Sequence, residues 1–222
     1  MSNSAEPRLR SGPTPPAGTP VTCVVLVLHG GKVTSIERSR PWHLSGLRMW
    51  QFTRDLRRAG RAEGIVVAQL QYRFRGWNGV ERSPVQDARW ALREIRRDHP
   101  DVHVVVVGHS MGGRTAAAVA DDPSVSGIVA LAPWWPDGGE LDGTHTDQVV
   151  RVVHGDADTW TDPVRARREV VAAAGRGVDA EFVSMPGGHF MLRRSRQWVR
   201  TTREFVMDIA RRRSAYNDEV AG

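Results

Sequence analysis

A serine flanked by glycines follows a run of valines in VVVVGHSMGGRTAAA, residues 104–118. Gly108, Ser110 and Gly112 fit the pattern G-x-S-x-G, in which small residues allow a sharp turn that lifts a serine hydroxyl above a sheet. The valines predict a buried strand, and the alanine-rich segment predicts a helix that begins at the turn. The amino end of such a helix favours developing negative charge beside the serine. The pattern indicates a nucleophile.

A nucleophilic serine needs a base, and the base needs an acid that orients it. Asp158 lies in VVHGDADTWTDP, just past a predicted strand, and His189 lies in the glycine-rich MPGGHFML that follows the last predicted strand. Asp156 lies in the same loop and is an alternative acid. Asp162, directly before Pro163, is expected to cap the next helix. Ser110, Asp158 and His189 are therefore the candidate catalytic residues, with Asp156 left as the alternative to Asp158.

An oxyanion hole is also predicted. The first apolar run ends in VLVLHGGK, and glycines let backbone amides approach a carbonyl oxygen closely. The amide of Met111, the residue after the serine, is expected to act together with the amide of Gly31, or failing that of Lys32.

Alternating apolar and amphipathic segments must position these residues. Strands are expected at 21–28, 64–72, 102–107, 126–132, 149–153 and 179–184, and helices at 44–60, 84–98, 111–121, 163–175 and 195–212. Such alternation is typical of an α/β, doubly wound and mostly parallel sheet with flanking helices. On the first helix, Leu44, Leu47, Trp50 or Gln51, and Leu56 form a stripe that is expected to face the core.

The domain organisation is expected to be simple. Residues 1–20, rich in Pro, Gly and Ser, predict a flexible leader, residues 21–213 predict one domain, and residues 214–222 predict a disordered tail. The turn-rich segment of about 16 residues after Ala132 is too short for a separate cap domain.

With the motifs HGG, GHSMGG, HGxxD and GGH in this order, residues 21–212 resemble the α/β-hydrolase fold, in particular small bacterial members without a cap. The resemblance implies a serine hydrolase that cleaves a carboxylic ester or a related acyl bond through a Ser-His-Asp triad and an acyl-enzyme. A thioesterase or acyltransferase acting on acyl-thioesters is an alternative. A weakly active binding protein of the same fold is another.

Aromatic and cationic side chains follow several predicted strands. Among eight tryptophans, Trp50, Trp90 and Trp198 fall on predicted helices and are expected in the core. The loop tryptophans form a substrate wall or pack the loops in place of a cap: Trp42, Trp77, Trp134, Trp135 and Trp160. Arg73 and Arg75 bind a substrate carboxylate or make structural ion pairs.

Composition excludes several classes of function. The net charge is +6, but the arginines are spread along the chain and mixed with acids, so no nucleic-acid partner is expected. A small-molecule acyl substrate is expected instead. The sequence lacks G-x-G-x-x-G and P-loop patterns and CxxC metal motifs, so neither a cofactor nor a metal is expected. Without an apolar signal or spanning segment, we expect a cytoplasmic protein that does not insert into a membrane. The oligomeric state stays open.

The remaining reactive side chains are expected to be structural. Cys23 predicts a buried thiol within a strand. His29 and His154 are expected to form hydrogen bonds at strand ends, and His109 to support the turn or lie at its rim. The other histidines are expected on the surface or in loops: His99, His103 and His145.

Overall fold

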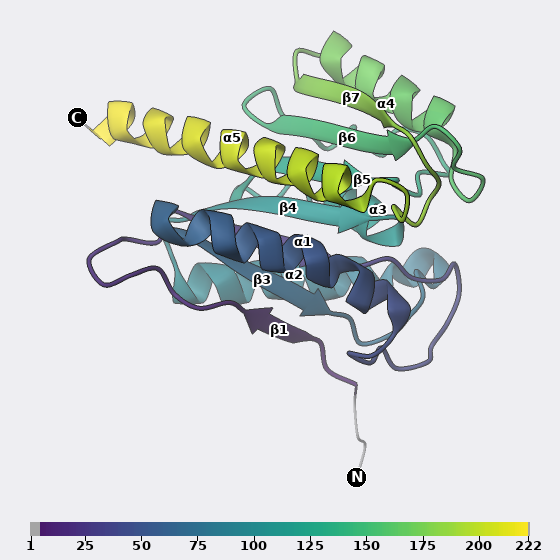
Figure 1. Cartoon of the computed structure of the whole chain (residues 1–222), viewed down its shortest axis with the longest axis horizontal. Coiled ribbons are helices and arrows are strands. Elements are labelled where there is room, and N and C mark those ends of the chain that lie inside the picture. Colours follow the sequence, from purple (N-terminus) through teal and green to yellow (C-terminus); the bar gives the residue numbers. More distant parts are fainter. Residues whose placement is uncertain (1–4, 222) are drawn as a thin grey trace.

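The computed structural model describes residues 5–221 and contains one sheet of seven strands. The strands are β1 (Arg8–Ser11), β2 (Cys23–Leu28), β3 (Ile65–Gln71), β4 (His103–His109), β5 (Val125–Leu131), β6 (Val149–Gly155) and β7 (Asp179–Met185). Their order across the sheet is β1-β3-β2-β4-β5-β6-β7, and all pairs except β1–β3 are parallel. Hence the loops after six parallel strands meet at one edge, on the right in Figure 1.

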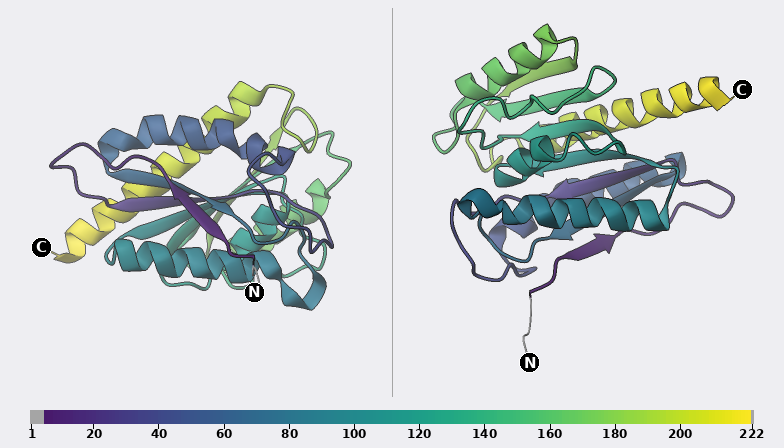
Figure 2. Two further views of the ribbon diagram at one scale, coloured as in Figure 1. Left: turned by 90° about the horizontal axis from the view of Figure 1, so that it is seen from below. Right: turned by 180° about the vertical axis from the view of Figure 1, so that it is seen from behind.

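Helices cover both faces of the sheet. They are α1 (Leu44–Gly60), α2 (Ser83–Asp98), α3 (Met111–Ala118), α4 (Pro163–Gly175) and α5 (Ser195–Ala221), with short 3₁₀ turns η1 (Arg61–Glu63) and η2 (Gly79–Glu81). Helices α1 and α5 lie on one face, and α2, α3 and α4 lie on the other (Figures 1 and 2). The expected doubly wound α/β architecture is therefore confirmed.

The central strands are buried on both faces, which explains their unbroken apolar runs. In β2 and β4, Val24 and Val104 face α2 and α3, whereas Val25 and Val105 face α1 and α5. This alternation follows from the two-residue period of a strand. The valine runs thus fill two cores, one under each helical layer.

Helix α1 has the expected bounds, but its buried face differs from the predicted one. Leu56 is buried, whereas Leu44, Leu47 and Trp50 are exposed. Met49 and Phe52 face the sheet instead. The prediction for Leu44, Leu47 and Trp50 was wrong because helical spacing gives the period of a stripe but not the face of α1 that meets the sheet.

Both predicted terminal segments contain regular structure. Residues 8–11, assigned to a flexible leader, form β1, which pairs antiparallel with β3 through Arg8 and Gln71. Its four residues contain a single apolar side chain, Leu9, too little for a strand pattern. Helix α5 runs to Ala221, so the tail predicted as disordered is helical up to that residue, and Gly222 lies outside the described residues.

The segment between β5 and β6 contains only turns and bends, so no cap domain interrupts the chain there. In the part of the chain that the structure describes, no helix combines the length and apolarity needed to cross a membrane.

Candidate active site

Ser110 occupies a strained turn between β4 and α3. Its φ of 56° and ψ of −117° lie in a region of backbone conformation that residues other than glycine rarely adopt. The surrounding main chain holds this conformation, because the Ser110 amide donates to the Leu131 carbonyl at 3.0 Å and its own carbonyl accepts from Trp134 at 3.1 Å. Strain of this kind persists only where the neighbouring structure imposes it.

Two glycines make the turn possible through close packing. A Cβ atom on Gly108 would lie 2.2 Å from the carbonyl oxygen of Gly112. A Cβ atom on Gly112 would lie 2.5 Å from the carbonyl oxygen of Leu28, the last residue of β2. The G-x-S-x-G pattern is therefore required by the contact between the first turn of α3 and the sheet.

A continuous chain of hydrogen bonds joins the three predicted catalytic side chains. His189 Nε2 lies 3.0 Å from Ser110 Oγ, and His189 Nδ1 lies 2.9 Å from Asp158 Oδ2. The side chains of His189 and Asp158 are 5% and 0% exposed. Loops after β4, β6 and β7 supply the three residues, and parallel strands bring these loops to one edge.

Asp158 receives more hydrogen bonds than its role toward His189 requires. Its Oδ1 accepts from the amides of Trp160 at 2.8 Å and Thr161 at 3.0 Å. Its Oδ2 accepts from Thr161 Oγ1 at 2.8 Å and lies 3.2 Å from His154 Nε2. Burial raises the pKa of Asp158, but the hydrogen bonds outweigh burial and hold that pKa well below its ordinary value. Asp158 is therefore an anion at every physiological pH.

The contribution of Thr161 and the contact of His154 with Asp158 were not predicted. Thr161 lies three residues after Asp158 and also approaches His189 Nδ1 at 3.3 Å. The only sequence signal was the position of Thr161 in an Asx-like turn, which is common on protein surfaces. Asp156, the alternative acid, instead accepts a hydrogen bond from the Gly187 amide at 2.9 Å, and no contact with His189 is seen among the described residues.

The three backbone amides predicted as possible oxyanion donors differ in whether a protein group accepts from them. Within the described residues, neither the Gly31 nor the Met111 amide donates to a protein acceptor. The Lys32 amide does, to the carbonyl of Arg75 at 2.8 Å, which corrects the prediction that Lys32 could serve as a donor. This hydrogen bond belongs to a parallel β-bridge between Lys32 and Gly76, which a local sequence pattern does not show.

His109 lies behind His189 and supports it. Its Nε2 donates to the His189 carbonyl at 3.0 Å, and the two ring centroids are 4.9 Å apart. Burial, and then the neighbouring His189, lower the pKa of His109 to about 3, so its ring stays neutral. His29 is likewise buried, and its ring approaches its neighbour's carbonyl. His103 was wrongly predicted on the surface, because it begins the central strand β4.

The five loop tryptophans separate into different environments. Trp160 is exposed and lies almost parallel to the His189 ring, with 6.2 Å between centroids. Trp42 is also exposed. Trp77 and Trp135 are buried in the core, so their assignment to an open substrate wall is corrected: these side chains pack beneath the loops. Trp134 is partly buried and meets Trp77 edge to face.

The arginines considered for substrate binding make structural ion pairs. Arg73 pairs with the buried Asp87, and the Arg73 amide donates to the same carboxylate at 2.7 Å. Arg75 pairs with Glu37 at 2.6 Å. Both contacts favour the structural alternative for these two residues.

Other reactive groups do not form a second centre. Cys23 is buried in β2, and burial raises the pKa of its thiol to about 12, which keeps it protonated. Among the residues that the structure describes, no cluster of three or more His, Cys, Asp or Glu side chains is arranged to hold a metal ion.

Known proteins resemble this chain in sequence and in fold. A family model described as "Alpha/beta hydrolase family" matches residues 24–219. Monoglyceride lipase of Mus musculus is 32% identical over 123 residues, which cover 53% of this chain and 37% of the mouse protein. The matched stretch thus spans little more than a third of that relative.

Two solved structures illustrate the likeness. A serine hydrolase without lid from Xanthomonas campestris superposes with a TM-score of 0.64 at 19% identity, covering 93% of this chain and 88% of the other. A thermophilic esterase from Thermogutta terrifontis with propionate bound gives a TM-score of 0.68 at 17% identity, covering 94% and 91%. At such identities the likeness concerns the fold alone.

Proposed function

Because this chain belongs to the alpha/beta hydrolase family, we propose that it is a serine hydrolase that cleaves a carboxylic ester through an acyl-enzyme on Ser110. The observation that carries the proposal is the hydrogen-bonded series from Ser110 Oγ through His189 to Asp158, built on a strained turn. Strained backbone conformations are concentrated at functional sites, so a serine held at a positive φ beside a buried histidine–carboxylate pair indicates a functional serine.

Each proton in the proposed reaction has an atom to occupy. Asp158 accepts the hydrogen at His189 Nδ1, so the lone pair of Nε2 faces the serine hydroxyl. As Ser110 Oγ bonds to the ester carbonyl carbon, its proton moves to Nε2. The anionic Asp158 stabilises the imidazolium that results. Nε2 then gives the proton to the departing alkoxide as the C–O bond breaks, and the acyl group stays on Ser110.

Water completes the cycle by the same path. His189 takes a proton from water, the hydroxyl attacks the acyl carbon, and the proton returns to Ser110 Oγ as the acid leaves. In both halves the carbonyl oxygen becomes an anion, and the amides of Gly31 and Met111 would stabilise it. Such donors contribute about 3 kcal/mol each in comparable sites.

The choice of an ester rests on the family and on the relatives. The relatives include a monoglyceride lipase and a thermophilic esterase. Trp160, exposed beside His189, offers an apolar surface for the acyl or alcohol part of the substrate. A thioester would use the same groups, so a substrate panel must separate the two.

The test is labelling with a fluorophosphonate, which reacts covalently only with an activated serine. The wild type should be labelled, whereas Ser110→Ala and His189→Ala should not, although both should show an unchanged circular dichroism spectrum. Hydrolysis of matched acyl esters and acyl-thioesters then identifies the preferred bond. A folded wild type that takes up no label and hydrolyses neither series would overturn the proposal and favour a binding protein of this fold.

A further inference from the structure

Exposed apolar side chains gather at the edge of the sheet that carries Ser110. Five of them, between 51% and 80% exposed, lie in the loop after β2, in the first turn of α1 and in the loop after β7: Ile36, Trp42, Leu44, Leu47 and Leu192. Large apolar side chains exposed on neighbouring segments mark a contact surface. We call this group the apolar rim.

The segments that carry the apolar rim adjoin one another and the active site. The Arg48 guanidinium of α1 lies 4.4 Å from the ring centroid of Phe190, which follows His189. Phe190 in turn contacts the His189 ring, with 5.3 Å between centroids. The beginning of α1 and the loop after β7 therefore form one surface around the catalytic histidine.

This surface is strongly cationic. Residues 32–48 and 186–196 together contain seven arginine or lysine side chains and a single carboxylate, Glu37. Glu37 is already neutralised by Arg75. A second copy of the chain would therefore meet like charge if this face packed against itself. An anionic partner is favoured instead.

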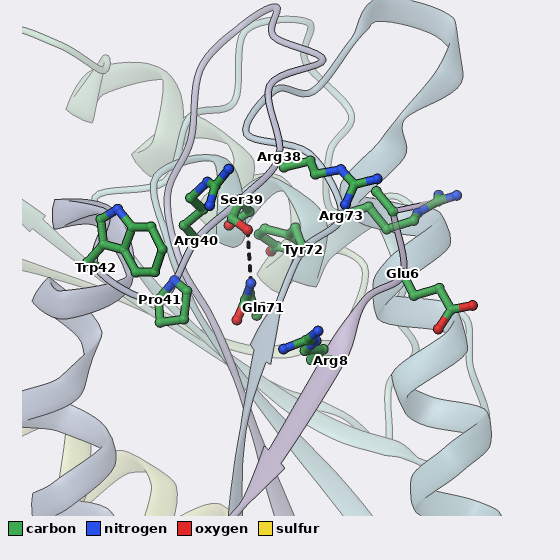
Figure 3. A pocket seen from close by; sticks show the side chains of 11 residues that line it. Glu6, Arg8, Arg38, Ser39, Arg40, Pro41, Trp42, Gln71, Tyr72 and Arg73 are labelled. Carbon is green, nitrogen blue, oxygen red and sulfur yellow. Dashed lines mark hydrogen bonds between the residues drawn. The ribbon is translucent and has the colours of Figure 1, made fainter. Parts of the chain in front are cut away.

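A hollow of about 550 Å³ lies beside the apolar rim and concentrates the charge. Figure 3 shows Arg8 on β1, Arg38 and Arg40 on the loop after β2, and Arg73 after β3, all lining it, with Trp42 at one side. Glu6 is the one carboxylate in its lining. The planar guanidinium of arginine matches the oxygens of a phosphate group. Arg73 contributes less than the other arginines because Asp87 offsets its charge.

The hollow is close to the reactive serine. Ser39, in its lining, lies 3.5 Å from the ring of His29. The next residue, Gly30, is so near the serine that a Cβ on it would lie 3.3 Å from Ser110 Cβ. A surface seated on the arginines and on the apolar rim would thus present its acyl chains at the catalytic serine.

We propose that the apolar rim and the arginine-lined hollow dock this protein onto an anionic lipid surface, with headgroup phosphates in the hollow and the rim side chains among the acyl chains. Apolar and basic side chains on one face bind such surfaces without crossing them. The inference deepens the proposed function, on which it rests, by making the substrate an ester presented at a lipid–water interface.

The test measures flotation of Ser110→Ala, which cannot hydrolyse lipid, with phosphatidylcholine vesicles that contain or lack phosphatidylglycerol. Binding should require phosphatidylglycerol and weaken with salt. Adding Leu44→Gln and Leu47→Gln should weaken binding at least about tenfold. Adding Arg8→Gln and Arg40→Gln should weaken it by about fivefold per arginine.

The matched control removes one charge and one exposed apolar side chain far from the rim. Arg168→Gln with Val171→Gln, both on α4, should bind vesicles as before. Equal binding to neutral vesicles, an equal loss in this control, or no vesicle binding would overturn the docking proposal. The proposal would also be overturned if glycerol phosphate displaced the bound protein from vesicles as effectively as added vesicles do. A dimer that dissociates when Leu44 and Leu47 are changed would overturn it too.

A water-soluble acetate ester separates this proposal from the proposed function. The otherwise wild-type Leu44→Gln/Leu47→Gln protein should hydrolyse that ester at the wild-type rate while losing vesicle binding. Hydrolysis of the soluble ester without vesicle binding refutes docking alone. Vesicle binding by a wild type that hydrolyses no ester refutes the proposed function alone.

Discussion

Replacing Asp158 with asparagine changes one atom in the centre of the site and reverses a hydrogen bond. In the wild type, Oδ2 accepts from His189 Nδ1, Thr161 Oγ1 and His154 Nε2, while Oδ1 accepts from two amides. An asparagine keeps its oxygen toward the two amides and so turns its NH₂ group toward His189. Nδ1 must then accept, which places the hydrogen on Nε2, facing Ser110.

The consequence for catalysis is large. With a hydrogen on Nε2, the imidazole cannot take the serine proton, and the negative charge that stabilises the imidazolium is gone. We expect kcat to fall by about 10⁴-fold, equivalent to about 5.5 kcal/mol in the barrier. The fold should survive, because Thr161 can rotate its hydroxyl and His154 can change tautomer, at a cost of about 1–3 kcal/mol in unfolding free energy.

The assay is steady-state hydrolysis of a soluble ester, supported by the rate of fluorophosphonate labelling and by urea unfolding. Asp156→Asn is the matched control, since Asp156 lies two residues away, is exposed, and its side chain accepts a hydrogen bond from the Gly187 amide. The control should retain kcat within about threefold. An Asp158→Asn enzyme within tenfold of wild type, or an equal loss in Asp156→Asn, would falsify the assignment of the acid.

Three further outcomes follow from single features of the structure. Gly31→Ala places a Cβ 2.4 Å from the Arg75 carbonyl oxygen, so the loop that contains Gly31 must move. We expect kcat to fall at least about a hundredfold with KM little changed. An unchanged kcat would contradict this prediction. The unfolding free energy should decrease as pH falls from about 6.5 towards 4. Buried His29 and His109, with pKa values of about 4 and 3, stay neutral in the folded protein while the unfolded chain takes up protons. Urea titrations should show a decrease of up to about 1.4 kcal/mol per pH unit for each histidine, and an unfolding free energy that does not change with pH would refute the prediction. Arg114→Met removes a guanidinium that lies 4.1 Å from the ring centroid of Trp77 and 4.6 Å from that of Trp134. The change should lower the unfolding free energy, measured in thermal melts, by about 1–3 kcal/mol. An unaltered melting temperature would show that these cation–π contacts contribute nothing to stability.

Local periodicity and motif order determined most of the architecture. The valine runs at β2 and β4 predict strands buried on both faces because few other structures bury consecutive β-branched residues. The bounds of α1 and α4 agree with those expected. Asp162 caps α4 as predicted, accepting from the Val164 amide at 2.9 Å.

Long-range contacts decided what a local pattern cannot express. Strand β1 exists because β3 offers it an open edge, and its own four residues have no apolar run. The stripe on α1 was misplaced because helical spacing gives a period but not which face meets the sheet. Lys32 lost its place as an oxyanion donor because a distant carbonyl, that of Arg75, takes its amide.

The same division applies to the site. Sequence order was enough to expect Ser110, Asp158 and His189 at one edge of the sheet, because each follows a predicted strand and parallel strands end at one edge. Only the folded chain shows that Trp77 and Trp135 are buried, and that His154 and Thr161 converge on Asp158. Burial and partner choice depend on residues far apart in the chain, so the tertiary structure alone decides them.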